Sequence, residues 1–136
     1  MSPRSKILVV DDDPCVRRLL SSILAPRFEV SVAMDAVGAV SAARRERPDL
    51  VILDYTLPAG NGTVVIDRLR SIPALSTTPV LMISGSSSGW SWEGLGNMDL
   101  VGFLLKPFTP DELLEEVSRA LGSDRVGVGV GVGVES

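Results

Sequence analysis

The sequence predicts a doubly wound α/β domain, in which a five-stranded parallel sheet is covered by helices on both faces. Five short apolar runs recur along the chain, at residues 6–10, 28–32, 50–53, 79–83 and 102–105. The runs at 6–10 and 50–53 lack the apolar–polar alternation of a strand with one wet face, which is typical of strands buried on both sides. Helical patterns separate the first four runs, and parallel strands need such crossovers.

The first two predicted helices follow the first and second apolar runs. Asp13 and Pro14 predict an N-cap and a first helical residue, and apolar residues at helical spacing continue to Leu24. The second helix is predicted over 36–46. We expect its apolar stripe to consist of Val37, Val40 and Ala43.

A third helix is predicted around 65–69, ending near Pro73. The last helix has a capping box, Thr109 with Glu112 three residues later, and is predicted to run to Leu121 with Gly122 as its stop. We therefore expect the globular domain to span 1–121. The Val/Gly repeat within 122–136 predicts a flexible tail, because glycine makes an ordered strand costly in entropy.

The segment 84–100 must hold the crossover between the fourth and fifth strands, yet it is rich in Ser and Gly. Each glycine in a helix interior costs ~1 kcal/mol relative to alanine. A short or mobile fourth helix is therefore predicted. Trp90 and Trp92 lie in this segment, where they either pack into the core or anchor a partner.

Composition excludes several classes of function. A chain of 136 residues with a net charge of −4 is sized for one domain and carries no basic footprint for nucleic acid. No apolar run reaches the roughly 18 residues of a membrane span, and residues 1–6 do not resemble a secretory signal. Cys15 is the single cysteine, which fits a reducing compartment. We expect a cytoplasmic protein without a membrane or a direct nucleic-acid partner.

The chain has no histidine, so acid–base or metal chemistry must rest on carboxylates, hydroxyls and lysine. Candidates stand where the predicted strands end. Asp11 and Asp12 follow the first strand, Asp54 ends the third, Ser84 follows the fourth and Lys106 follows the fifth. If the strand order is 2-1-3-4-5, the first and third strands are neighbours and their carboxylates converge at the switch point of the sheet.

Several carboxylates this close together repel one another and call for a cation. An oxygen-only donor set favours Mg²⁺ over zinc. A lysine and the Ser84 hydroxyl beside such an ion make a phosphoryl-transfer site, in which positioning and charge neutralisation dominate. Asp13 is interpreted as a helix cap outside this site.

Four segments, VVDDDP (9–14), LDYTLPAGNG (53–62), MISG (82–85) and FLLKPF (103–108), resemble the signature segments of the response-regulator receiver family. The resemblance covers 6–121 and implies a flavodoxin-like three-layer sandwich with strand order 2-1-3-4-5. It also implies roles for single residues. Asp54 would be the phosphoacceptor, and Asp12 a direct Mg²⁺ ligand with Asp11 as its water-mediated neighbour. Thr56 would offer a backbone carbonyl to the metal. Ser84 would contact the phosphoryl group, Lys106 would pair with the acceptor, and Phe103 would be the aromatic switch. The Lys106–Pro107 bond is often cis in the family.

The resemblance further implies two kinds of partner. A histidine kinase or histidine phosphotransfer protein would donate the phosphoryl group, since this chain has no histidine. A downstream protein would bind the face formed by the fourth helix, fifth strand and fifth helix. The chain would thus be a two-component signalling phosphoacceptor that supplies its own transfer and dephosphorylation groups, and not an enzyme in the usual sense. Phe103 could equally be a plain core residue.

Three alternatives remain beside this interpretation. A haloacid-dehalogenase-type phosphatase would need D-x-D-x-T after the first strand, which Asp11–Asp12–Asp13–Pro14 does not provide. A pseudo-receiver would keep the fold as an interaction module without phosphorylation. The segment could also be the receiver part of a hybrid histidine kinase, although Met1 and the lack of a kinase-like segment favour a stand-alone chain. No output domain is expected after 121.

Overall fold

The computed structural model describes residues 4–55, 62–85 and 100–122. It contains one five-stranded parallel sheet in the order β2-β1-β3-β4-β5. The strands are β1 (Lys6–Val10), β2 (Glu29–Ala33), β3 (Leu50–Asp54), β4 (Val80–Gly85) and β5 (Gly102–Lys106). The fold class and the strand order predicted from the sequence are confirmed.

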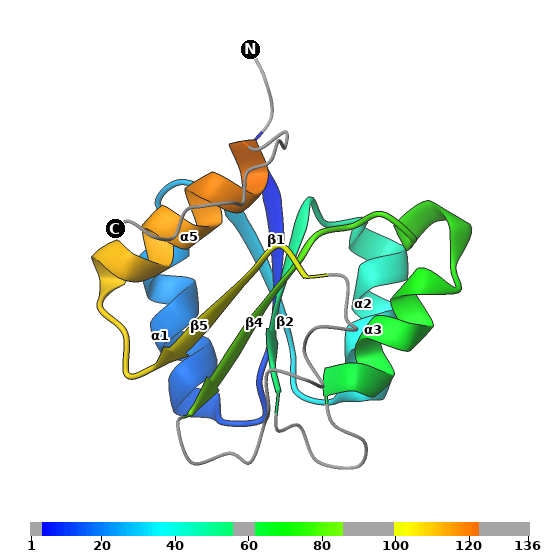
Figure 1. Cartoon of the computed structure of the whole chain (residues 1–136), viewed down its shortest axis with the longest axis horizontal. Helices are drawn as coiled ribbons and strands as arrows, with labels where there is room; N and C mark the ends of the chain where they lie inside the picture. Colours follow the sequence, from blue (N-terminus) through cyan, green and yellow to red (C-terminus); the bar gives the residue numbers. More distant parts are fainter. Residues whose placement is uncertain (1–3, 56–61, 86–99, 123–136) are drawn as a thin grey trace.

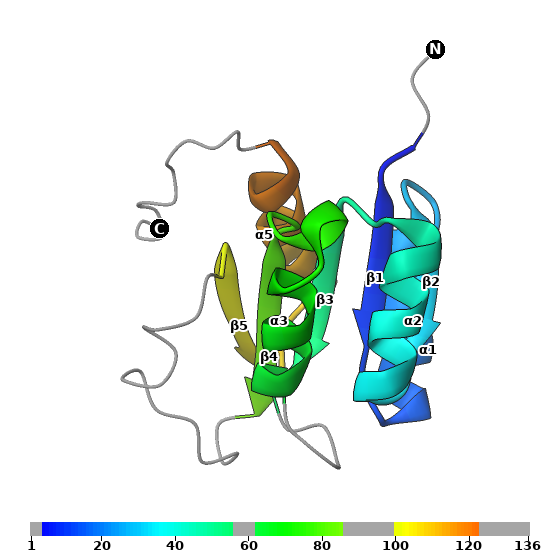
Figure 2. The ribbon, with the colours of Figure 1, turned by 90° about the vertical axis from the view of Figure 1, so that its right-hand side faces the viewer.

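Helices cover both faces of the sheet, which makes three layers (Figure 1). On one face lie α1 (Pro14–Leu24) and α5 (Pro110–Gly122), and on the other lie α2 (Ala36–Glu46) and α3 (Gly62–Arg70). A short 3₁₀ turn, Pro73–Leu75, follows α3. Figure 2, turned by 90°, shows α2 and α3 in front of the strands. In the described parts of the chain, no helix is long and apolar enough to cross a membrane.

The central strands contribute side chains to two hydrophobic cores, one on each face of the sheet, because successive side chains of a strand point to opposite faces. Leu8 and Val10 of β1 pack in the cluster beneath α2 and α3, whereas Ile7 and Val9 pack beneath α1 and α5. All four side chains are fully buried. Burying an aliphatic side chain of this kind contributes ~1.5–3 kcal/mol, so the unbroken apolar run predicted for a two-sided strand is what holds β1 in the middle of the sheet.

Three strands, β2, β4 and β5, have bounds that differ from the sequence prediction. The strand β2 lies one residue later than the run 28–32. Its register sets Lys6 opposite Glu29 and Val10 opposite Ala33, so pairing with β1 decides the boundary. The strands β4 and β5 extend further than predicted, to Gly85 and Lys106. Ser84 and Lys106 therefore stand on paired strands and not in the loops that follow them.

The predicted apolar stripe of α2 is confirmed at Ala43, which is buried, and wrong at Val37, which is 74% exposed. The helix also buries Ala39 and Ala42, which the stripe did not include. Small side chains let α2 approach the sheet and α3 closely, and this outweighs the larger apolar area of valine. Gly122 is the last residue of α5 and not the residue after it.

The predicted helix starts are confirmed by their hydrogen bonds. Asp13 caps α1 by accepting a hydrogen bond from the backbone N–H of Cys15 at 2.8 Å. Thr109 and Glu112 form the reciprocal capping box, with distances of 3.0 and 2.8 Å. The predicted fourth helix with both tryptophans, the Val/Gly tail and Thr56 lie outside the described residues.

Candidate functional site

Asp11 lies immediately after β1, at the carboxyl edge of the sheet. Its backbone N–H donates to the carbonyl of Ala33 at 3.1 Å, which continues the pairing of β1 with β2 by one residue. Its carboxylate has no exposed surface, and Oδ1 accepts a hydrogen bond from the backbone N–H of Asp13 at 2.9 Å. The turn that leads into α1 thus folds around the Asp11 side chain and fixes its direction.

Asp54 is the last residue of β3 and lies opposite Ile83 of β4. It too is buried, although the strand around it is otherwise apolar. Because β1 and β3 are neighbours, the carboxylates of Asp11 and Asp54 meet at one edge of the sheet. Carboxylate oxygens of Asp11, Asp12 and Asp54 lie within 4.8 Å of one another, and Asp12 is the exposed member of the three. The convergence expected from the strand order is confirmed as geometry.

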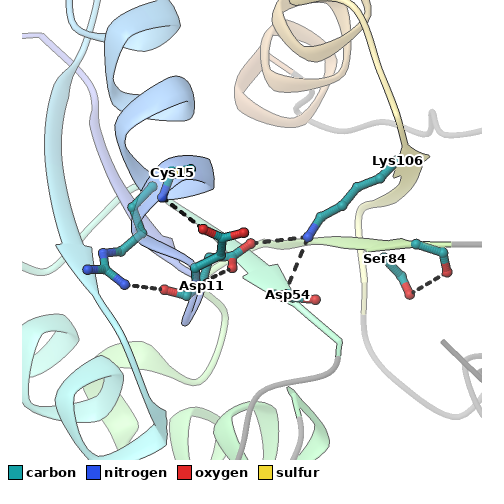
Figure 3. A network of polar contacts seen from close by, with 8 residues as sticks. Asp11, Cys15, Asp54, Ser84 and Lys106 are labelled. Carbon is teal, nitrogen blue, oxygen red and sulfur yellow. Dashed lines mark hydrogen bonds and ion pairs between the residues drawn. The ribbon is translucent and has the colours of Figure 1, made fainter.

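Lys106 reaches this cluster from the end of β5. Its ammonium nitrogen lies 3.4 Å from Oδ2 of Asp11 and 3.6 Å from Oδ2 of Asp54, as Figure 3 shows. The Lys106–Pro107 peptide bond is cis, as the resemblance led us to expect. One cation therefore faces both buried carboxylates, and its side chain remains 28% exposed.

The electrostatics of the site centre on Asp11. Burial raises the pKa of this carboxyl above its ordinary value of 3.8, and the nearby Asp54 carboxylate raises it further. The Asp13 N–H and the Lys106 ammonium act in the opposite direction, because both stabilise the charged form. Burial outweighs them, so the net result is a raised pKa for the Asp11 carboxyl.

Ser84 lies on β4, fully buried, with its hydroxyl donating to the carbonyl of Gly85 at 3.2 Å. In Figure 3 it lies beyond Lys106 as seen from Asp11. Phe103 pairs with Met82 in the sheet and is partly buried against the core beneath α2 and α3. It is therefore a packed side chain at the edge of that core.

One contact at the site was not anticipated from the sequence. The guanidinium of Arg17, on α1, donates from Nη1 to the backbone carbonyl of Asp11 at 2.9 Å. The available signal was an arginine at the start of the helix that follows the acidic run. Arg17 is one of eleven arginines, and nothing in its spacing separates it from a surface residue.

The site offers few kinds of chemical group. Within the described residues, the site offers carboxylate oxygens and one ammonium group, with a hydroxyl nearby. Hard oxygen donors suit Mg²⁺, which keeps several water molecules and uses few protein ligands. Asp11, Asp12 and Asp54, of which only Asp12 is exposed, are together a group that could hold such an ion.

Comparison with known proteins places this geometry in a family. The model of the response regulator receiver domain matches residues 7–118. The DNA-binding response regulator MtrA of Mycolicibacterium smegmatis is 35% identical over 127 residues, which cover 87% of this chain and 51% of MtrA. The protein-glutamate methylesterase/protein-glutamine glutaminase of Rhizobium etli is 38% identical over 75% of this chain and 31% of that protein. The chain thus spans about half or less of these relatives.

Comparison with solved structures supports the same family. The chemotaxis protein CheY4 of Vibrio cholerae superposes with a TM-score of 0.79 at 30% identity, over 87% of this chain and 99% of CheY4. The receiver domain of the sensor histidine kinase PA1611 of Pseudomonas aeruginosa, solved with magnesium coordinated in its active-site cleft, has a TM-score of 0.80 at 25% identity. That match covers 88% of this chain and 99% of the other. With the matching fold, the acidic cluster and the family model over most of its length, this chain belongs to the response regulator receiver family of two-component systems.

Proposed function

We propose that Asp54 accepts a phosphoryl group from a phosphohistidine of a histidine kinase or histidine phosphotransfer protein. The observation that carries this proposal is the placing of Lys106 between two buried carboxylates, Asp11 and Asp54, next to the exposed Asp12. A purely structural site would gain little from two buried carboxylates side by side, because each costs desolvation and repels the other. In a phosphorylation site, by contrast, the carboxylates would bind a cation and Asp54 would accept the phosphoryl group.

The cation proposed is Mg²⁺, with Asp12 as a direct ligand, Asp54 as a second and Asp11 acting through a water molecule. The backbone carbonyl of Thr56 would complete the protein ligands. The close approach of three carboxylates supports this set, as does the magnesium ion in the cleft of the related PA1611 receiver. When bound, Mg²⁺ supplies positive charge that offsets the carboxylates and the phosphoryl oxygens.

In the transfer itself, a carboxylate oxygen of Asp54 attacks phosphorus while the bond from phosphorus to the histidine nitrogen breaks. The electron pair of that bond returns to the imidazole, which takes up a proton. Lys106 already lies 3.6 Å from the attacking carboxylate and can follow the negative charge onto the phosphoryl group. The Ser84 hydroxyl, fully buried on the adjacent strand, would exchange its bond with the Gly85 carbonyl for one with a phosphoryl oxygen.

The output we propose is a change in a protein-binding surface. Movement of Ser84 toward the new anion would draw in the end of β4, and Phe103 would turn further toward the core, which it already borders. The face concerned is that of the fourth helix, β5 and α5. Under this proposal residues 1–121 form the receiver, and the chain signals in the cytoplasm without touching nucleic acid itself.

The test is incubation with Mg²⁺ and acetyl phosphate, followed by intact mass. The wild type should gain the mass of one phosphoryl group, and Asp54→Ala should not. The matched control is Asp67→Ala, an exposed aspartate on α3 outside the acidic cluster, which should be phosphorylated like the wild type. A wild type that gains no mass would overturn the proposal in favour of a pseudo-receiver.

A further inference from the structure

The backbone carbonyl of Asp11 lies where the chain leaves the sheet. The N–H of Asp11 still pairs with the carbonyl of Ala33, but α1 begins three residues later and turns the chain away from β2. Arg17 provides the partner for this carbonyl, with its Nη1 at 2.9 Å. The contact is partly buried and reaches back from the first turns of the helix, whose own backbone bond runs from the N–H of Arg17 to the carbonyl of Asp13 at 3.0 Å.

With this contact, Asp11 is held at four atoms by four different partners. Ala33 holds its N–H and Asp13 holds Oδ1, while Lys106 faces Oδ2 and Arg17 holds the backbone oxygen. Asp13 and Lys106 direct the carboxylate, whereas Ala33 and Arg17 fix the main chain from which that carboxylate extends. We propose that Arg17 is a positioning residue, which sets the Asp11–Asp13 turn so that the acidic cluster binds its cation.

Arginine suits this position for two reasons. A guanidinium group has five N–H donors in a rigid plane, so one can bind the carbonyl while the others stay hydrated. Its charge is also permanent and approaches Asp11 through the backbone carbonyl, whereas the Lys106 ammonium approaches through the carboxylate. The two cations therefore act at opposite ends of one residue, and only Lys106 competes with an incoming metal for the carboxylate.

The surroundings of Arg17 indicate that its role is not core packing. Its side chain lines an open pocket of about 320 Å³ between α1, β2 and α2, together with Val32, Met34, Ser41 and Arg45. Shortening the side chain enlarges a space that solvent already reaches and leaves no sealed void. A variant at this position should therefore fold, and its defect should lie in the geometry of the turn.

This inference rests on the proposed function, so its test begins with Mg²⁺ alone. Calorimetric titration of wild type, Arg17→Gln, Arg17→Lys and Arg18→Gln compares four folded proteins. Arg18 is the matched control, because it is the next residue of α1, is exposed and loses the same charge. We expect Arg17→Gln to weaken Mg²⁺ binding about tenfold, the scale found when a group supporting a metal ligand is removed. Arg18→Gln should stay within about twofold, since solvent screens its charge.

Arg17→Lys should recover part of the affinity, because an ammonium can still donate to the carbonyl. A second measurement separates positioning from damage to the fold: at saturating Mg²⁺, phosphorylation of Arg17→Gln by acetyl phosphate should return close to the wild-type rate. Equal Mg²⁺ affinities for Arg17→Gln and Arg18→Gln would overturn the inference, as would a rate defect that saturating Mg²⁺ does not repair. A wild type that binds no Mg²⁺ would instead overturn the proposed function, and the role of Arg17 with it.

Discussion

The ammonium group of Lys106 lies 3.4 Å from Oδ2 of Asp11, a carboxylate that the fold hides completely from solvent. The two residues are 95 positions apart and come from β5 and the end of β1. Because the same ammonium is 3.6 Å from Asp54, it compensates two buried charges from one place. Lys106 is thus a counter-ion for two buried carboxylates as well as a candidate for phosphoryl transfer.

Replacing Lys106 by methionine should destabilise the metal-free protein. Two buried carboxylates would lose their cation, a loss that costs about 3–5 kcal/mol for a fully buried pair. Since the Lys106 side chain is 28% exposed, solvent screening reduces this to roughly 1–2 kcal/mol. Urea unfolding at neutral pH without metal measures the change.

Lys6→Met is the control for net charge, because Lys6 is the only other lysine of the chain. Its ammonium makes one contact of 3.3 Å, to the Glu46 carbonyl at the end of α2, and faces no buried carboxylate in the described contacts. Lys6→Met should therefore lower the free energy of unfolding by less than Lys106→Met does. Equal unfolding midpoints for the two variants would contradict the counter-ion role.

The raised pKa of Asp11 makes the stability of the metal-free protein depend on pH. An acid whose pKa is higher in the folded state holds its proton more tightly there than in the unfolded chain. Its contribution is therefore complete below 3.8, the ordinary pKa, and is lost as pH rises through the raised value of the folded protein. The Asp11→Asn variant cannot ionise at this position. Its stability relative to the wild type should therefore increase as pH rises through the raised pKa of Asp11.

At neutral pH we expect Asp11→Asn to melt above the wild type, because it carries no buried charge at this position. Below pH 3.8 the difference should close. Thermal unfolding without metal over this pH range measures both. Asp13→Asn, at an exposed cap that asparagine fills well, controls for the change in charge. Parallel melting profiles for Asp11→Asn and the wild type would refute the assignment.

The sheet and the convergence of the acidic residues could be predicted because both follow from local pattern. Apolar runs as dense as 50–53 have no stable place except between two layers of helices, and parallel strands end at one edge. Asp11 and Asp54 therefore had to meet once β1 and β3 were neighbours. The caps were equally predictable, because Asp13 and Thr109 bond to backbone groups two or three residues away.

The buried face of α2, the Arg17 contact and the start of β2 could not be predicted, because they depend on packing and pairing between distant parts of the chain. Val37 fits a helical stripe as well as Ala39 does, and only the closeness of α2 to the sheet selects the alanines. The bond from Arg17 to the Asp11 carbonyl joins a long side chain to a backbone atom, so hydrophobic periodicity carries no trace of it. The start of β2 likewise follows from its register with β1 and not from its own residues.

Gly102 should resist substitution because of its neighbours. A Cβ there would lie 3.0 Å from Cδ1 of Leu81 and 3.1 Å from Oε1 of Glu116. Leu81 is fully buried and has little room to move. We expect Gly102→Ala to lower the free energy of unfolding by about 1 kcal/mol, at the low end for overpacking. Urea unfolding measures it.

Gly85→Ala is the control, since a Cβ at Gly85 meets nothing within 4 Å although this residue also lies in a paired strand. It should be neutral or slightly stabilising, because alanine restricts the unfolded chain. If both alanine variants unfold at the same urea concentration, close packing at Gly102 is not what requires glycine.

Ser84→Ala should separate catalysis from stability. The change removes one oxygen from a fully buried side chain whose bond to the Gly85 carbonyl contributes only about 1 kcal/mol, so the fold should survive. Losing a donor to the developing phosphoryl charge should slow phosphorylation on the order of 100-fold to 1000-fold. Rates with acetyl phosphate at saturating Mg²⁺, followed by intact mass, measure this. Ser84→Thr retains the hydroxyl and should retain most of the rate. An unchanged rate in Ser84→Ala would leave Ser84 a purely structural residue of β4.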